Sequence, residues 1–219
     1  LSRNFATPFF SLNISEFWRR WHMTLTNWMM DYIFTPLSFI LRSYQKIGLI
    51  ISVIITFLVV GLWHGANWTY LIFGLVHGIY FIPVIVKGSS INKSSSVIAE
   101  NKYFPSVIEL FKMFVLLIQV MLVSVFFRSE TVTKAVNYLS SIFTKSLISL
   151  PSSLINGRNA IIVMLIIFFM IIEWFNRAKP HEFDVSNRSM YVRWFFYIFI
   201  FILLLFAGRS ADAFIYFQF

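Results

Sequence analysis

Residues 47–65 read IGLIISVIITFLVVGLWHG, and this stretch decides the fold. The seventeen residues from Ile47 to Trp63 are uncharged and mostly apolar, which is typical of a membrane-spanning helix. His64 follows directly, and an ionisable side chain at membrane depth is unfavourable enough to be a candidate functional residue by default. Histidine also exchanges protons readily near neutral pH. The alternative interpretation is a histidine that is simply hydrogen-bonded at a helix end or lies among lipid headgroups.

The composition places the chain among membrane proteins. Its 219 residues are 58% hydrophobic and 20% aromatic but only 12% charged. A soluble domain is about half apolar and about a quarter charged. We therefore predict an all-α membrane domain over residues 1–219, built as a polytopic helical bundle. The absence of cysteine excludes disulfides and thiolate metal sites.

Residues 13–35 are predicted to form an amphipathic helix that lies at the membrane interface. Asn13 is a plausible N-cap, and Glu16 completes an approximate capping box. The apolar stripe consists of Trp18, Trp21, Leu25, Trp28, Met29 and Tyr32. The other faces carry Arg19, Arg20, Thr24, Asn27 and Asp31. Pro36 should end or kink this helix near Thr35.

Residues 47–86 are predicted to form a helical hairpin that carries His64 and His77. The link at residues 65–67 is too short for a soluble loop, so the two helices must be antiparallel neighbours. Each helix contains a Gly-Leu-x-His-Gly pattern, at residues 61–65 and 74–78, and such small-xxx-small spacing lets backbones approach closely. For His77 we favour a packed histidine that is hydrogen-bonded to a neighbouring helix.

Residues 107–208 are predicted to contain three further spans, which gives five in all. They are the apolar runs 107–127, 160–172 and 194–208. The last two are shorter than the ~20 residues of an ideal span, so they either extend into flanking polar residues or cross a thinner bilayer. Residues 87–106 are predicted to be a solvated loop, and residues 128–157 a mixed segment with a short surface helix that ends at Pro151.

The net charge of +9 is spread between the apolar runs, which argues against a nucleic-acid binder and favours loops that face an anionic lipid bilayer. Thirteen of the eighteen Lys and Arg residues fall in segments 1–46, 87–112 and 173–193. These segments share one side of the predicted membrane topology. The positive-inside rule places that side in the cytoplasm.

The chemistry suggested by the residues is acyl transfer with a histidine base. Gly-x-Ser-x-Gly, Walker A and Gly-x-Gly-x-x-Gly patterns are absent from the sequence. The spacing of His22, His64 and His77 does not match a metalloprotease, so we predict no metal centre. A histidine in an apolar setting can take the proton of a hydroxyl that attacks an activated acyl group. Exclusion of water would protect a thioester from hydrolysis.

Four blocks in chain order resemble a known family. They are Ser15-Glu-Phe-Trp-Arg-Arg-Trp-His22-Met-Thr-Leu, Trp28-Met-Met-Asp31-Tyr32-Ile-Phe-Thr-Pro36-Leu, Gly61-Leu-Trp-His64-Gly-Ala-Asn-Trp68 and Gly74-Leu-Val-His77-Gly. Together they resemble the bacterial membrane-bound O-acyltransferase family, especially its alginate O-acetyltransferase branch, with the teichoic-acid D-alanylation protein as a relative. The closing residues 214–219 also resemble the end of the alginate branch. Proteins of this branch are longer, so we interpret the sequence as a C-terminal portion that is inactive alone.

The resemblance implies a multi-pass core in a bacterial plasma membrane, pierced by a tunnel. His64 would be the general base, and His22 a second catalytic position. The resemblance and the motifs give these substrate-binding candidates: Trp18, Arg19, Arg20, Trp21, Asn27, Asp31, Trp63, Asn67 and His77. The donor would be acetyl-CoA or another acyl thioester from the cytoplasmic side, with no bound cofactor. The acceptor would be an extracytoplasmic glycan or a secreted carrier partner of the SGNH type.

A competing hypothesis is a transporter or channel subunit in which His64 and His77 relay protons or line a solute path. Such proteins commonly contain internal repeats. The short Gly-Leu-x-His-Gly echo is too small to count as one.

Overall fold

The computed structural model describes residues 2–88, 98–99, 102–144, 157–177 and 188–207, and their regular structure is helical, with no strand among them. This confirms the predicted all-α membrane class. The long helices are α4 (Gln45–His64), α5 (Trp68–Val86), α6 (Val107–Arg128), α8 (Gly157–Asn176) and α9 (Met190–Ala207). The shorter helices are η1 (Pro8–Phe10), α1 (Ile14–Arg20), α2 (Met23–Met29), η2 (Met30–Phe34), α3 (Thr35–Ile40), η3 (Arg42–Tyr44) and α7 (Val132–Ile142).

Four helical stretches are long and apolar enough to cross a membrane within the described residues. They are Arg42–His64, Trp68–Val86, Val107–Arg128 and Asn159–Asn176. A shorter apolar helix, Met190–Ile202, begins before the fifth predicted run and overlaps its first part. The fourth run is longer than its apolar core because the helix continues through Glu173 to Asn176, which gives α8 twenty residues. The predicted end of the fifth run at Gly208 and the closing residues 214–219 lie outside the described part of the chain.

The helix predicted over residues 13–35 is not continuous, and the prediction was wrong at His22. Trp21 is extended and His22 adopts a left-handed conformation with φ 45°, so α1 and α2 are separate helices. The backbone of the preceding segment holds this break. Ala6 N–H donates to Arg20 O and Met23 N–H donates to Asn4 O, both at 2.9 Å. These bonds occupy groups that a straight helix would pair internally.

The two ends of this amphipathic segment also differ from the simple pattern. Asn13 caps α1 as predicted, because its Oδ1 accepts from Glu16 N–H at 2.9 Å. The Glu16 carboxylate instead accepts from Leu12 N–H. Pro36 does not stop the chain near Thr35, because the π-helix η2 leads directly into α3, where Pro36 occupies a first-turn position. A first-turn proline has no helical hydrogen bond to lose.

Helices α4 and α5 form the predicted antiparallel hairpin, with direct backbone contact. A Cβ atom on Gly74 would lie 2.1 Å from Phe57 O, and one on Gly61 would lie 2.3 Å from Tyr70 O. Only glycine therefore fits at these two crossing points. Gly65, with φ 147°, ends α4 and permits the sharp turn into α5.

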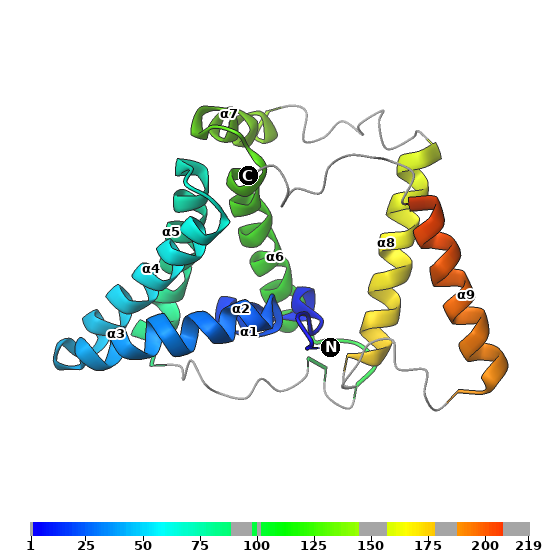
Figure 1. Ribbon diagram of the computed structural model, residues 1–219, viewed down its shortest axis with the longest axis horizontal. Helices are drawn as coiled ribbons and strands as arrows, with labels where there is room; N and C mark the ends of the chain where they lie inside the picture. Colours follow the sequence, from blue (N-terminus) through cyan, green and yellow to red (C-terminus); the bar gives the residue numbers. More distant parts are fainter. Residues whose placement is uncertain (1, 89–97, 100–101, 145–156, 178–187, 208–219) are drawn as a thin grey trace.

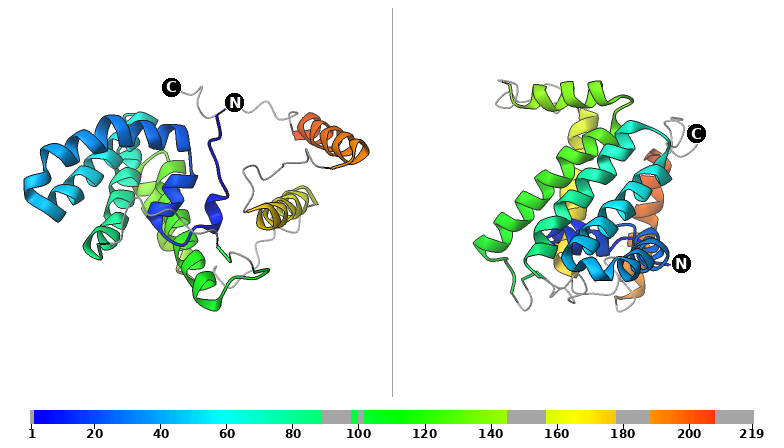
Figure 2. Two further views of the ribbon diagram at one scale, coloured as in Figure 1. Left: turned by 90° about the horizontal axis from the view of Figure 1, so that it is seen from below. Right: turned by 90° about the vertical axis from the view of Figure 1, so that its left-hand side faces the viewer.

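The arrangement of the elements is clear in Figure 1. Helices α1, α2 and α3 form a layer along the lower ends of α4 and α6, with α3 beside α4, and α7 lies across the upper end of α6. Helix α6 packs against α5. Helices α8 and α9 stand apart from the α4–α6 group in Figure 1 and in the left view of Figure 2. The surface helix predicted to reach Pro151 ends earlier, at Ile142, and Pro151 itself lies outside the described residues.

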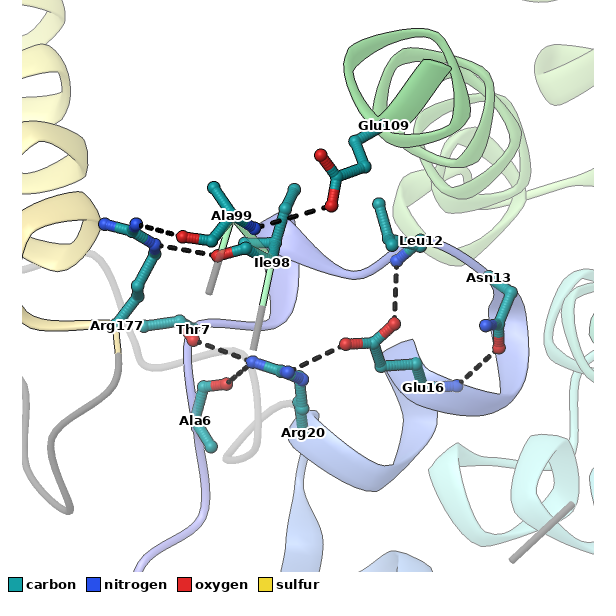
Figure 3. A network of polar contacts seen from close by, with 10 residues as sticks. All are labelled: Ala6, Thr7, Leu12, Asn13, Glu16, Arg20, Ile98, Ala99, Glu109 and Arg177. Atoms are coloured by element: carbon teal, nitrogen blue, oxygen red, sulfur yellow. Dashed lines mark hydrogen bonds and ion pairs between the residues drawn. The ribbon is translucent and has the colours of Figure 1, made fainter. Parts of the chain in front are cut away.

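The lower end of α8 is tied to the segment before α6. The Arg177 guanidinium donates to Ile98 O and Ala99 O, both at 2.9 Å (Figure 3). It also donates to Lys102 O at 2.6 Å. Trp174 Nε1–H donates to Tyr103 O at 3.0 Å. These contacts lie away from the α4–α5 hairpin and hold α8 in place.

Candidate functional site

A cavity of about 830 Å³ brings together three histidines from separate parts of the chain. His22 comes from the α1–α2 break, His64 from the end of α4 and His77 from the middle of α5. The cavity runs along one face of α6, from Phe9 near the amphipathic layer to Tyr138 on α7. The cavity therefore extends from the α1–α3 layer to α7, which lie at opposite ends of the α4–α6 group. No cluster of three or more potential metal ligands occurs within the described residues.

His64 faces this cavity from the last position of α4. Its half-buried ring is surrounded by aromatic rings, with centroid distances of 4.8 Å to Phe127 and 6.2 Å to both Tyr70 and Phe73. The described residues give the ring these contacts but no hydrogen bond. The imidazole is thus held in place by packing while its nitrogen atoms stay available for a ligand.

His22 reaches the cavity because the chain turns sharply between α1 and α2. Its ring lies perpendicular to the Trp63 ring at 5.8 Å, and Trp63 in turn contacts His64 at 4.8 Å. The Nδ1 atom of His22 is buried and has no hydrogen-bond partner among the described residues. Trp63 is therefore a shared neighbour of both candidate catalytic histidines.

His77 is packed, as the sequence led us to expect. Its side chain is 1% exposed, and its Nδ1 accepts a hydrogen bond from Trp18 Nε1–H at 3.4 Å. The Trp18 and Phe73 rings lie 5.0 Å and 4.6 Å from its ring. Because Nδ1 is the acceptor, a neutral His77 carries its proton on Nε2. This residue joins the amphipathic layer to the hairpin and forms part of the cavity wall.

The other predicted substrate-binding residues divide between two cavities and the surface. Trp21 lines the histidine cavity, and Trp18 lies between it and a second cavity of about 220 Å³. Arg19 and Asn27 line only the second cavity. Burial lowers the pKa of Arg19, and the Glu16 carboxylate opposes this effect. Two of the predicted residues are thus separated from the histidines by the Trp18 indole.

Arg20, Asn67 and Asp31 do not line either cavity. Arg20 pairs with the buried Glu16 carboxylate at 2.7 Å and donates to Thr7 Oγ1 at 3.0 Å, which fixes the N-terminal segment (Figure 3). Asn67 caps α5, where its Oδ1 accepts from Thr69 N–H at 3.1 Å. Asp31 is exposed on η2. Arg20 and Asn67 therefore have structural roles.

Several cavity residues, most of them on or next to α6 and α7, were not predicted. They are Phe73 on α5, Ser124, Phe127 and Arg128 on α6, Ser129 after it, and Tyr138 on α7. One local signal existed, because Ser124 and Arg128 are polar residues four apart in an apolar helix and so share a face. No local signal marks Tyr138, since it enters the cavity only when α7 folds across the end of α6.

The sequence of the chain matches those of known proteins. Residues 2–123 match the model of the membrane-bound O-acyltransferase family. A probable alginate O-acetylase of Azotobacter vinelandii is 43% identical over 70 residues, which cover 30% of this chain and 13% of that protein. A peptidoglycan O-acetyltransferase of Helicobacter pylori is 38% identical over 76 residues, or 35% of this chain and 14% of that protein.

A more distant relative matches a longer stretch of this chain. A teichoic acid D-alanyltransferase of Streptococcus thermophilus is 29% identical over 104 residues, which cover 45% of this chain and 24% of that protein. In all three comparisons the matched stretch spans less than a quarter of the relative's length.

Proposed function

Because the chain belongs to the membrane-bound O-acyltransferase family, we propose that it forms the histidine-bearing part of an enzyme that transfers an acyl group from a thioester to a hydroxyl. The observation that carries the proposal is the position of His64. Its ring faces a cavity that reaches both ends of the helical group, and aromatic rings surround it. The names of the relatives, which refer to O-acetylation and D-alanylation, support the same class of reaction.

In this mechanism His64 is the general base. An imidazole nitrogen takes the proton of the acceptor hydroxyl while its oxygen attacks the thioester carbonyl carbon, which gives a tetrahedral intermediate. The carbon–sulfur bond then breaks, and the leaving thiolate takes the proton from the imidazolium. The ester and the free thiol are the products. Packing by Phe73 and Phe127 limits the access of water, which would otherwise hydrolyse the thioester.

The two substrates approach from opposite ends of the cavity. Acetyl-CoA or another acyl thioester enters from the cytoplasmic side, where the α1–α3 layer and most of the Lys and Arg residues lie. His22, with its unpaired buried Nδ1, helps to position the donor at this end. The acceptor, an extracytoplasmic polysaccharide or a secreted SGNH-type carrier, enters from the α7 end. We propose that this membrane is a bacterial plasma membrane, since the relatives are bacterial proteins.

The test follows labelled acyl groups in membranes that contain the intact protein. A positioned general base contributes about 10²–10⁴-fold in rate, so His64→Ala should lower transfer by this factor. The control is Ile51→Ala, because Ile51 lies on the same helix, is 40% exposed and does not line either cavity. Both variants must be recovered from membranes at wild-type levels. Wild-type transfer by His64→Ala would refute the proposal, and histidine-dependent solute flux without acyl transfer would favour a transporter.

A further inference from the structure

The second cavity, of about 220 Å³, lies between the amphipathic layer and the hairpin, and the mechanism above does not use it. Residues of α1, α2 and η2 form one wall of this cavity, and residues of α4 and α5 form the other. These elements pack against each other, since α1 contacts α5 and η2 contacts α4. The second cavity therefore sits at the junction of the amphipathic layer with a membrane-spanning hairpin.

Two side chains separate the second cavity from the histidine cavity. Trp18 and Leu25 line both cavities, and they are only 6% and 9% exposed. The hydrogen bond from Trp18 to His77, together with a ring contact to Phe57 at 5.0 Å, holds the indole in this position. A ligand of the second cavity is thus kept apart from His64. A substrate whose reacting atoms must reach His64 does not fit this arrangement.

The second cavity is polar at one end and apolar at the other. The polar side chains come from α1 and α2 and are Ser15, Arg19, Thr26 and Asn27. The apolar end consists of buried residues of α4 and α5, namely Val53, Phe57, Val60 and Phe81. Asn27 is the most exposed of all the lining residues, and Arg19 is half-buried. The mouth of the cavity therefore lies at its polar end.

Arg19 gives the polar end a positive charge. Burial lowers the pKa of Arg19, the Glu16 carboxylate raises it, and the neighbouring Arg20 lowers it. The same carboxylate pairs with Arg20 at 2.7 Å and accepts from Leu12 N–H at 2.9 Å, so several donors share its charge. One carboxylate beside two arginines leaves a net positive charge in this region. Because a guanidinium can form parallel hydrogen bonds with a carboxylate or a phosphate, the polar end suits an acidic group.

The position of the second cavity relative to the membrane favours a lipid-like ligand. The exposed rings of Trp28 and Tyr32 lie 5.2 Å apart directly after Asn27, and such aromatic residues are typical of the headgroup region. Val53 and Val60, at the other end, lie in the interior of a membrane-spanning helix. The predicted topology places the amphipathic layer on the cytoplasmic side, where lipids are commonly anionic.

We propose that the second cavity binds an anionic amphiphile of the membrane, with its acidic head at Arg19 and part of its hydrocarbon chain beside Val53, Phe57 and Val60. An acidic phospholipid and a free fatty acid share this chemistry. The cavity is smaller than the roughly 300–1,000 Å³ of a typical ligand site, so the rest of the chain stays in the bilayer. The proposal does not depend on acyl transfer, because this ligand does not reach His64.

The test measures lipid binding to the intact protein in a neutral detergent. Labelled dioleoylphosphatidylglycerol, oleate and dioleoylphosphatidylcholine are titrated separately, and mass spectrometry of the intact protein counts the bound molecules. We expect one bound molecule of either acidic amphiphile. Phosphatidylcholine, whose head has no net charge, should bind about tenfold more weakly, since it lacks the charge that Arg19 selects. The acidic amphiphile with the lower Kd identifies the source of the ligand as bilayer lipid or free fatty acid.

Matched variants separate charge from packing. Arg19→Gln should raise the Kd of both acidic amphiphiles by about tenfold and leave that of phosphatidylcholine unchanged. Arg42→Gln is the control, because Arg42 is exposed on η3 and lines neither cavity, and it should bind like the wild type. Val60→Phe fills the apolar end and should abolish binding of all three lipids. If Val60→Phe is not recovered, the lipid preference of the wild type and of Arg19→Gln still decides the question.

The outcomes also separate this proposal from the proposed function. Equal binding of the three lipids by the wild type, or binding that Arg19→Gln does not change, would overturn the amphiphile site. Displacement of the bound lipid by excess acetyl-CoA would overturn it too, because the cavity would then belong to the acyl donor. His64→Ala should bind lipids like the wild type. Its acyl transfer therefore tests the proposed function without affecting this one.

Discussion

Trp18 donates its indole N–H to Nδ1 of His77 across 3.4 Å, and this bond connects the amphipathic layer with the transmembrane hairpin. Both residues are buried, with exposures of 6% and 1%. Trp18→Phe keeps a ring but leaves Nδ1 without its donor, which typically destabilises a protein by about 1–3 kcal/mol. We expect a lower melting temperature in detergent for this variant. Trp28→Phe, at a tryptophan that is 49% exposed, is the control and should melt like the wild type.

The glycine contacts of the hairpin predict a graded series. Gly74→Ala would place a Cβ atom 2.1 Å from Phe57 O, whereas Gly78→Ala would place one 3.1 Å from Ile54 Cα. The first contact forces the helices apart, and overpacking of this kind costs about 1–3 kcal/mol. The second requires a much smaller shift. Thermal unfolding should therefore show a larger loss for Gly74→Ala, and equal losses would contradict the close crossing of α4 and α5.

The ion pair between Arg20 and Glu16 should matter more than the pair on the surface of α7. The side chains of Arg20 and Glu16 are 11% and 4% exposed. Removal of one partner from a buried pair costs about 3–5 kcal/mol of stability. Arg20→Met should therefore destabilise the protein strongly. Glu130→Gln breaks the exposed pair with Lys134, and this should change stability little because solvent screens such surface pairs. Comparable unfolding midpoints for the two variants would show that Arg20 does not anchor the N-terminal segment.

His22 has a left-handed backbone, so two substitutions at this position can separate the structural role of the residue from its chemical role. At φ 45° a residue with a Cβ atom is strained by about 1–2 kcal/mol, and glycine is not. His22→Gly should therefore be more stable than His22→Ala. Both should transfer acyl groups more slowly than the wild type, since neither has an imidazole. If His22→Gly retains wild-type transfer, the histidine has no part in positioning the donor.

The hairpin was predictable because its signals are local. A long apolar run, two glycines beside each histidine and a three-residue link determine the antiparallel pair and the position of His64 within it. The pair of Glu16 and Arg20 was also visible, since residues four apart on a helix are neighbours. Sequence reasoning had instead assigned Arg20 to the substrate.

The break at His22 and the position of Tyr138 in the cavity wall could not be predicted from local sequence signals. The first depends on two backbone hydrogen bonds between residues at least fourteen positions apart, in which Ala6 N–H donates to Arg20 O and Asn4 O accepts from Met23 N–H. The second depends on the packing of Ala135, which carries α7 across the end of α6. The apolar stripe of residues 13–35 continues through the break because α1 buries Trp18 while α2 buries Leu25 and Met29. Periodicity alone therefore could not reveal it.

The backbone pairing of Asn4 and Ala6 around His22 places control of one catalytic candidate outside the transmembrane helices. Lipid thickness acts on α4 and α5, whereas the turn that presents His22 is held by a segment that belongs to neither helix. A protease or a binding protein that captured residues 4–6 would release this turn and leave the spans intact. Acyl transfer would then stop while the protein remained inserted in its membrane.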